Sequence, residues 1–133
     1  MHAHAVKAQI HLVGIIEPEN LPAYASNFDV GLALELTVPE NRDICLTNKV
    51  FTYLLAGNAI ISSETEMQKI FNEEFRSGVT YPINDVKLLI EKINKFKESS
   101  VLRQQRLHNY NLGKNHLNWE NESTKLLNRL TAN

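Results

Sequence analysis

The fold is decided by residues 47–62, which read Thr47-Asn48-Lys49-Val50-Phe51-Thr52-Tyr53-Leu54-Leu55-Ala56-Gly57-Asn58-Ala59-Ile60-Ile61-Ser62. Thr47 is a residue type that begins helices and Gly57 one that follows their end, so the first part predicts a helix roughly 15 Å long. The apolar run 59–62 comes directly afterwards and predicts a strand covered on both faces. A helix that leads at once into such a strand is typical of α/β proteins.

The flanking sequence repeats this alternation. The β-branched run 10–16 predicts one strand, residues 21–27 a short helix, and residues 30–34 a second buried strand. Downstream, capping-box spacing predicts a helix within residues 63–75, and residues 79–81 predict a short strand. Strands that alternate with helices form right-handed βαβ units. The sequence therefore predicts an α/β fold with a Rossmann-like, three-layer open parallel sheet.

From residue 84 onward the pattern is helical. One apolar stripe at helical spacing predicts a helix that packs on the core; it comprises Val86, Leu89, Ile90, Ile93 and Phe96. A second helix is expected from Ser100 to Leu112, with Gly113 as its end. A last helix carries Trp119 and three leucines on one side, and we expect Trp119 to anchor it. This helical tail completes a single domain over residues 1–133.

Composition narrows the class of protein. The 133 residues are 43% hydrophobic and 22% charged, with a formal charge of −1, so no basic excess points to nucleic acid. The single cysteine, Cys45, cannot form an internal disulfide and is expected to be buried or half-buried. No apolar run approaches the length of a membrane span, and no signal peptide precedes the first strand. We expect a cytoplasmic protein without a transmembrane segment.

The sequence gives little indication of a metal site or of a nucleophilic side chain. His2, His4 and His11 are too scattered between a chain end and a strand to suggest a metal site. No histidine is paired with Cys45 by any recognisable spacing, so a nucleophilic cysteine is not expected. We expect neither a metal nor a cofactor.

Candidate binding residues gather where the predicted strands end. In open parallel sheets, ligands bind at the carboxyl ends of the strands. Three segments should converge there: Gly14-Ile15-Ile16, the loop from Glu35 to Asn48, and Ser62-Ser63-Glu64-Thr65. These segments contribute the candidate ligand-binding residues.

The second segment is the most informative. It brings Arg42, Asn48 and Lys49 to the start of a helix, whose free N–H groups and dipole favour anions. A cation with hydroxyl and amide donors at such a helix end suits a phosphate or a sugar. In the alternative interpretation, Thr47 only caps the helix, Lys49 is solvated, and Arg42 pairs with Asp43.

Three stretches in a fixed order also resemble a known family: Asn20-Leu21-Pro22-Ala23-Tyr24, Phe28-Asp29-Val30-Gly31-Leu32, and Asn48-Lys49-Val50-Phe51-Thr52-Tyr53-Leu54-Leu55-Ala56-Gly57-Asn58-Ala59-Ile60-Ile61. This order resembles the C-terminal domain of GT-B type, group 1 retaining glycosyltransferases of surface-polysaccharide biosynthesis. The closing Leu117-Asn118-Trp119-Glu120 is similar to that family's terminal helix. The resemblance covers about residues 10–130.

The resemblance implies a Rossmann-like half that holds a nucleotide diphosphate sugar. The loop matching Gly14 and Ile15 would lie against the base, and the loop from Glu35 to Asn48 would face the sugar and diphosphate. In the family the helix beginning at Asn48-Lys49 holds the ribose, and the Ser62-Ser63 turn lies close to the same crevice. The family's ribose-binding glutamate falls at Thr52, and its second acidic residue falls at Ile44.

Two functions follow from these observations. The first is a glycosyltransferase fragment: the C-terminal, donor-binding half of a two-domain enzyme, inactive without the N-terminal acceptor half of its parent chain. Lys49 and Arg42 would offset phosphate charge, Asn48 and Thr52 would contact hydroxyls, and Glu35 would contact the sugar. The second is a non-catalytic α/β binding or interaction module derived from such a half. In either case a bare interdomain face could allow self-association.

Overall fold

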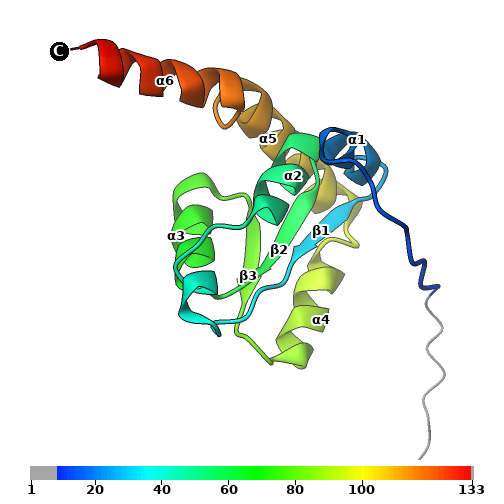
Figure 1. The fold of residues 1–133 in the computed structure, drawn as a ribbon. Helices are drawn as coiled ribbons and strands as arrows, with labels where there is room; N and C mark the ends of the chain where they lie inside the picture. The colour runs from blue at the N-terminus through cyan, green and yellow to red at the C-terminus, as the bar shows by residue number, and fades with distance from the viewer. Residues whose placement is uncertain (1–8, 133) are drawn as a thin grey trace, which may run out of the picture.

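Three parallel strands form the centre of the computed structural model, which describes residues 9–132 (Figure 1). The strands are β1 (Val30–Ala33), β2 (Ala59–Ser63) and β3 (Gly78–Tyr81). They lie in the order β1-β2-β3, so that β2 is the middle strand and β1 and β3 are edges. The register pairs Ala33 with Ser62 and Ser63 with Tyr81. The carboxyl ends of all three strands therefore meet at one edge of the sheet.

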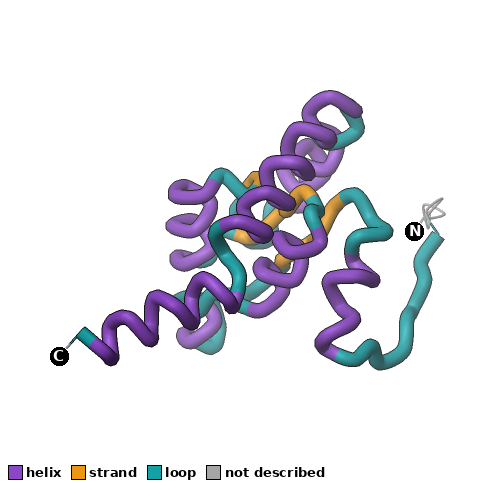
Figure 2. The backbone as a smooth tube through the Cα atoms, turned by 90° about the horizontal axis from the view of Figure 1, so that it is seen from above, coloured by secondary structure: helices purple, strands orange, loops and turns teal. Residues whose placement is uncertain are grey.

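Helices cover both faces of this sheet (Figure 2). On one face, α2 (Asn48–Ala56) and α3 (Glu66–Phe75) enclose a core that contains Ala33, Val50, Leu54, Ile60 and Phe71. On the other, α4 (Val86–Lys95) and α5 (Ser99–Asn115) enclose a core that contains Ala59, Ile61, Tyr81 and Phe96. These layers confirm the predicted α/β class with an open parallel sheet, consistent with a Rossmann-like fold.

Helix ends that the sequence marks locally are found close to where they are predicted. A 3-10 turn (Pro18–Asn20) leads into α1 (Leu21–Ala25), which lies near the predicted span 21–27. The N-cap of α2 is Thr47, and its C-cap is Gly57, whose φ of 70° lies in the left-handed region. Glycine adopts this conformation without the steric penalty that a side chain would carry, which is why the helix stops there.

The predicted strand at residues 10–16 is wrong. The segment is extended but unpaired, and the side chains of Ile10, Leu12, Val13 and Ile15 are between 54% and 101% exposed. β-branched residues favour a strand only when another strand and a packed face are available to them. No described strand lies along this segment, so its β-branched residues favour a strand that has no partner to pair with.

Gly113 does not end the helix as predicted, because α5 continues through it to Asn115. A Cβ at Gly113 would lie 3.2 Å from the backbone oxygen of Leu54 in α2. The missing side chain therefore serves a close approach between α5 and α2, not a helix stop. The sequence contains the glycine but not the second helix that explains it.

The helix predicted from residue 86 forms, but its stripe is only partly buried. Phe96 is buried and Leu89 packs against the same core, whereas Val86, Ile90 and Ile93 are exposed. The sheet in the described part of the chain has only three strands, so it offers α4 a narrow surface. The expectation that the whole stripe is core packing is therefore wrong for these three side chains.

The last helix, α6 (Trp119–Thr131), extends away from the sheet in both views (Figures 1 and 2). Trp119 is exposed, so the expectation that its indole anchors this helix by burial is wrong. Among the described residues, no helix combines the length and the apolar character that crossing a membrane requires.

Candidate functional site

Glu35 lies at the centre of the polar groups beyond the carboxyl ends of β1 and β2. It follows β1, and the backbone around it is held by Ser63 at the end of β2. The Ser63 hydroxyl accepts a hydrogen bond from the Glu35 N–H and donates one to the Glu35 carbonyl, both at 2.8 Å. Two of the three segments expected to converge therefore do meet. Both hydrogen bonds of the Ser63 hydroxyl hold the backbone of Glu35.

The Glu35 carboxylate forms a partly buried ion pair with Lys49. Lys49 Nζ lies 2.6 Å from Glu35 Oε1, and the Thr47 hydroxyl donates to the same oxygen at 3.1 Å. The Glu35 side chain is 6% exposed and that of Lys49 is 51% exposed. The hydrogen bond from Lys49 is the main reason that the pKa of Glu35 lies below its ordinary value, and burial opposes this shift. The ammonium group is therefore paired on one side and open to solvent on the other.

Arg42 and Asp43 do not pair with each other in the described part of the chain. Arg42 ends a 3-10 turn (Glu40–Arg42) and is exposed, although its charge also lowers the pKa of Glu35. Asp43 instead caps α3, since its carboxylate accepts from the Glu66 N–H at 3.0 Å. The acidic side chain thus occupies the positive end of α3. The start of α2 has no comparable carboxylate bonded to its first amides among the described contacts.

Beside the start of α2 lies a cavity of about 420 Å³, here called the α1–α2 pocket. Among the sequence-predicted residues it brings together Asn48, Lys49 and Thr52. The other lining residues are Ile16, Leu21, Tyr24, Ala25, Phe28, Val30, Tyr53 and Asn58. The pocket thus combines a mainly apolar wall with a few polar groups from α2, which is the usual composition of a small-molecule site.

Three aromatic side chains in this pocket were missed by the sequence analysis as site residues. Tyr24 and Phe28 lie with their ring centroids 5.4 Å apart, and Tyr53 comes from α2. Tyr53 packs over Gly31, where a Cβ would lie 2.2 Å from its ring. The sequence did contain a signal for these side chains, because all three belong to the stretches that carry the family resemblance. Their position on one wall depends on how α1 packs against α2.

Asn58 closes the floor of the pocket. Its Nδ2 donates to the carbonyls of Ala25 and Phe28, at 3.0 and 2.6 Å, and so ties α1 to the start of β2. Its Oδ1 is buried without a hydrogen-bond partner among the described residues. A buried acceptor of this kind costs free energy unless a donor reaches it.

The remaining predicted residues lie outside the pocket. Gly14 and Ile15 are exposed on the unpaired segment, and only the adjacent Ile16 reaches the lining. Ser62 is buried at the end of β2. The first of the three expected segments therefore meets the others only through Ile16, because the strand meant to position it does not form.

Other reactive side chains form no cluster. Cys45 is exposed, so the expectation of burial is wrong. His2 and His4 lie outside the described residues, and His11 is exposed. Within residues 9–132 no group of three histidine, cysteine or acidic side chains is placed to hold a metal ion.

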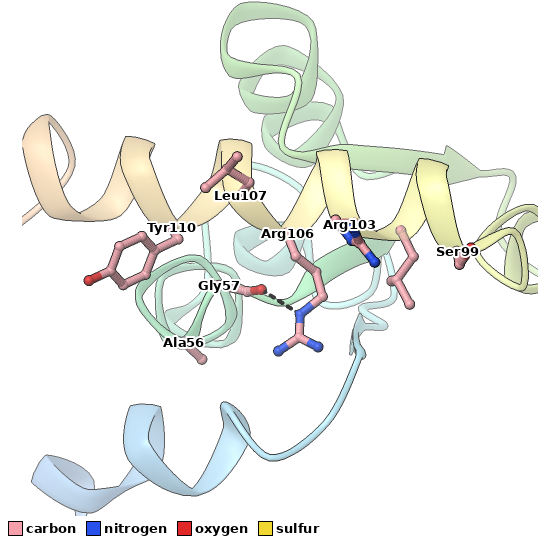
Figure 3. Close-up of a pocket in the computed structure, with 8 residues that line it drawn as sticks. Ala56, Gly57, Ser99, Arg103, Arg106, Leu107 and Tyr110 are labelled. Atoms are coloured by element: carbon pink, nitrogen blue, oxygen red, sulfur yellow. Dashed lines mark hydrogen bonds between the residues drawn. The ribbon is translucent and has the colours of Figure 1, made fainter.

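A larger hollow of about 530 Å³ lies along α5 near the α2–β2 turn (Figure 3). One of the two arginines in its lining, Arg106, points from α5 toward Gly57, to whose carbonyl Nε donates at 3.1 Å. Nη1 of Arg106 also binds Asp29 at 2.7 Å. This guanidinium group fastens α5 to the loops that precede β1 and β2, and most of its donors are already used. We therefore do not assign a ligand to this hollow.

Comparison of the chain with protein-family models, curated proteins and solved structures gives no match.

Proposed function

We propose that this chain binds a nucleotide diphosphate sugar as the donor-binding half of a group 1 glycosyltransferase. The nucleoside would occupy the α1–α2 pocket, with the diphosphate at the start of α2. The observation that carries the proposal is the meeting of Asn48, Lys49 and Thr52 with an aromatic wall in one pocket. Transfer of the sugar to a saccharide or lipid-linked acceptor would require the N-terminal acceptor half of the parent protein.

The dimensions and lining of the pocket support a nucleoside. Its volume of about 420 Å³ lies within the range of roughly 300–1,000 Å³ that small-molecule sites span. Tyr24 offers a ring face on which a base can stack, and stacking does not depend on which base is present. Asn48 and Thr52 supply amide and hydroxyl groups for ribose or sugar hydroxyls.

The charge at the start of α2 supports the diphosphate. One proton of the Lys49 ammonium group is used by Glu35, and an ammonium group has three, so two remain for phosphate oxygens. Glu35 holds the ammonium group of this side chain in place, while the first amides and the dipole of α2 add positive potential. Arg42, exposed on the loop before α2, can approach the same anion.

Catalysis in such a site would come from positioning and from charge. Holding the donor and stabilising the departing diphosphate lowers the barrier without a nucleophilic side chain. Thr52 stands where the family has a ribose-binding glutamate, and a hydroxyl makes a weaker bond to a ribose than a carboxylate does. We therefore expect donor binding near the millimolar range.

The cellular setting is part of the same proposal. An exposed, unpaired Cys45 suits a reducing compartment, so we place the protein in the cytoplasm. Its expected partners are the nucleotide sugar and the acceptor half, not nucleic acid.

Titration with uridine and guanosine diphosphates, by calorimetry and by thermal shift, tests this function. We expect saturable heat and a rise in melting temperature with one of the two. Tyr24→Ala should weaken that binding about tenfold by removing a stacking face. Tyr110→Ala is the matched control, because Tyr110 is also exposed but lies on α5. No heat and no thermal shift at millimolar nucleotide would defeat the proposal.

A non-catalytic α/β module is the second candidate, and the closed Lys49–Glu35 pair favours it. Glu35 already offsets the charge of Lys49, so a phosphate gains less from this lysine, and the acidic pair of the family is replaced by Ile44 and Thr52. The Lys49→Ala variant separates the two candidates. It should abolish nucleotide binding if the site is functional and change only stability if the pair is structural; Lys69→Ala, on the exposed side of α3, is its control.

A further inference from the structure

Helix α6 carries an apolar stripe that the described part of its own chain leaves uncovered. Residues 119, 126, 127 and 130 lie on one side of the helix, and these side chains (Trp119, Leu126, Leu127 and Leu130) are between 54% and 74% exposed. The start of the helix is well defined, since the Asn118 side chain accepts from the Asn121 N–H at 2.9 Å. A capped helix with an open apolar face is the form of a helix that packs against another one.

The spacing of the stripe suits pairing with a second helix. Trp119, Ser123, Leu126 and Leu130 follow one another at intervals of four, three and four residues, which is the seam of a two-helix contact. With this seam, Glu122 and Arg129 occupy equivalent positions on one flank, seven residues apart. The flank thus carries a negative charge near the start of the helix and a positive charge near its end.

The charges on this flank attract those of a second copy only when the two helices run in opposite directions. In an antiparallel pair, equivalent flanks face each other, so Glu122 of one copy meets Arg129 of the other, twice. In a parallel pair, Glu122 would face Leu127 of the second copy, and neither charge would be used. Glu122 already binds Lys125 through Oε1 at 2.6 Å, which leaves its other oxygen for the second copy.

We propose that two copies of this chain associate through an antiparallel pair of α6 helices. The layers of the contact are Trp119 against Leu130 of the second copy and Ser123 against its Leu126, each repeated by symmetry. This surface is distinct from the strand-end face at which the donor is proposed to bind.

The surface next to Trp119 extends the contact. Trp119 also lines a cavity of about 500 Å³ at the base of α6, and most of that lining is apolar; it includes Leu46, Phe51, Leu55, Phe71, Phe75 and Leu117. With Leu130 of the second copy on Trp119, the end of the second α6 reaches the mouth of this cavity. The cavity thereby gains an apolar neighbour on the side where Trp119 lies.

The length of α6 limits the affinity. Its 13 residues span roughly 20 Å, and such a contact is smaller than the ~800 Å² per partner of standard interfaces. We expect a dissociation constant on the order of 100 µM. The dimer should therefore form and dissociate across concentrations that sedimentation can reach.

Sedimentation equilibrium and fluorescence from about 1 µM to 1 mM test the proposal on the full chain. The chain has one tryptophan, so emission reports Trp119 alone. We expect the mean mass to rise towards a dimer while the emission shifts to shorter wavelength as the indole is covered. Leu126→Gln should remove both changes. Leu107→Gln, an equally exposed leucine on α5, should leave them intact.

Charge reversal tests the antiparallel direction. Glu122→Arg and Arg129→Glu should each weaken the dimer about tenfold, because two attractions become repulsions. The double variant should restore it, and a mixture of the two single variants should associate more tightly than either alone. Lys87→Glu, on the exposed side of α4, controls for the change in net charge.

Each outcome has a definite meaning. A wild-type chain that stays monomeric to 1 mM overturns the proposal and leaves the stripe to a different partner. The proposal is also overturned if the Leu126→Gln variant still forms the dimer, or if the double charge variant does not regain it. Circular dichroism of each variant at about 1 µM, where the chain should be monomeric, checks that α6 still forms.

Discussion

At the scale of single residues, Glu35 is the side chain whose chemistry is most strongly set by its neighbours. It is buried, it accepts from Lys49 and Thr47, and its pKa lies below its ordinary value. A carboxylate with a lowered pKa stabilises the fold at pH values above its unfolded pKa. That contribution is lost as the pH falls through the folded pKa.

Glu35→Gln should therefore destabilise the chain at pH 7 by about 1–2 kcal/mol. The amide oxygen can still accept from Thr47, but the neutral side chain no longer forms an ion pair with Lys49. Urea unfolding of both proteins at pH 7 and at a series of lower pH values measures this. The difference between them should shrink as the pH falls through the folded pKa of Glu35, because the wild-type carboxyl then becomes protonated. A difference that is the same at both pH values would mean that charge pairing is not what Glu35 contributes.

The candidate site could be predicted only in part at this scale. Asn48, Lys49 and Thr52 were identifiable because a helix start and a residue order place them together along the chain. The partnership of Lys49 with Glu35 depends on how the loop between β1 and α2 folds back, which no local pattern encodes. Tyr24 and Phe28 were visible as residues, but their role as a pocket wall depends on the packing of α1 against α2.

At the scale of elements, a buried amide helps to hold α5 at the amino end of the sheet. Asn109 Nδ2 donates to the carbonyls of Asn58 and Ser77, at 2.6 and 2.7 Å, and these residues precede β2 and β3. Asn109→Ala would leave both carbonyls without this donor, at a cost of about 1–3 kcal/mol. Gln104→Ala, on the exposed side of the same helix, should be nearly neutral. Denaturant midpoints of the two variants should differ accordingly, and equal midpoints would show that the Asn109 bonds do not anchor α5.

Helices were predicted more reliably than strands for a physical reason. The bounds of α2 depend on Thr47 and Gly57, and a helix satisfies its own backbone hydrogen bonds. A strand needs a neighbour, so the same β-branched composition gives the buried strand β2 and, at residues 10–16, an unpaired segment. Gly113 shows the converse error, because a local stop signal was outweighed by packing between two helices.

At the scale of the whole molecule, the two ends of the sheet are used differently. Arg106 and Asn109 fasten α5 across the amino end, and the carboxyl end carries Glu35 with Lys49. The α1–α2 pocket runs between these ends, from Lys49 at the start of α2 to Asn58 just before β2. The polar residues Asn48 and Lys49 of the pocket thus lie toward the carboxyl end, whereas Phe28 and Asn58 lie toward the amino end. The charged part of a ligand is therefore to be sought at the carboxyl end, where parallel sheets in general bind their ligands.

Whether residues 10–16 contribute to the stability of the fold can be tested. If residues 10–16 are unpaired, replacing Ile10, Leu12 and Ile15 together by serine removes exposed apolar surface and should change the free energy of unfolding by less than about 0.5 kcal/mol. Ile61→Ser, in the middle strand, should cost several kcal/mol, because it buries a hydroxyl where a methyl and an ethyl group packed. Urea unfolding measures both variants. A triple variant destabilised as strongly as Ile61→Ser would mean that this segment belongs to a packed sheet after all, and that the free edge of β1 is covered.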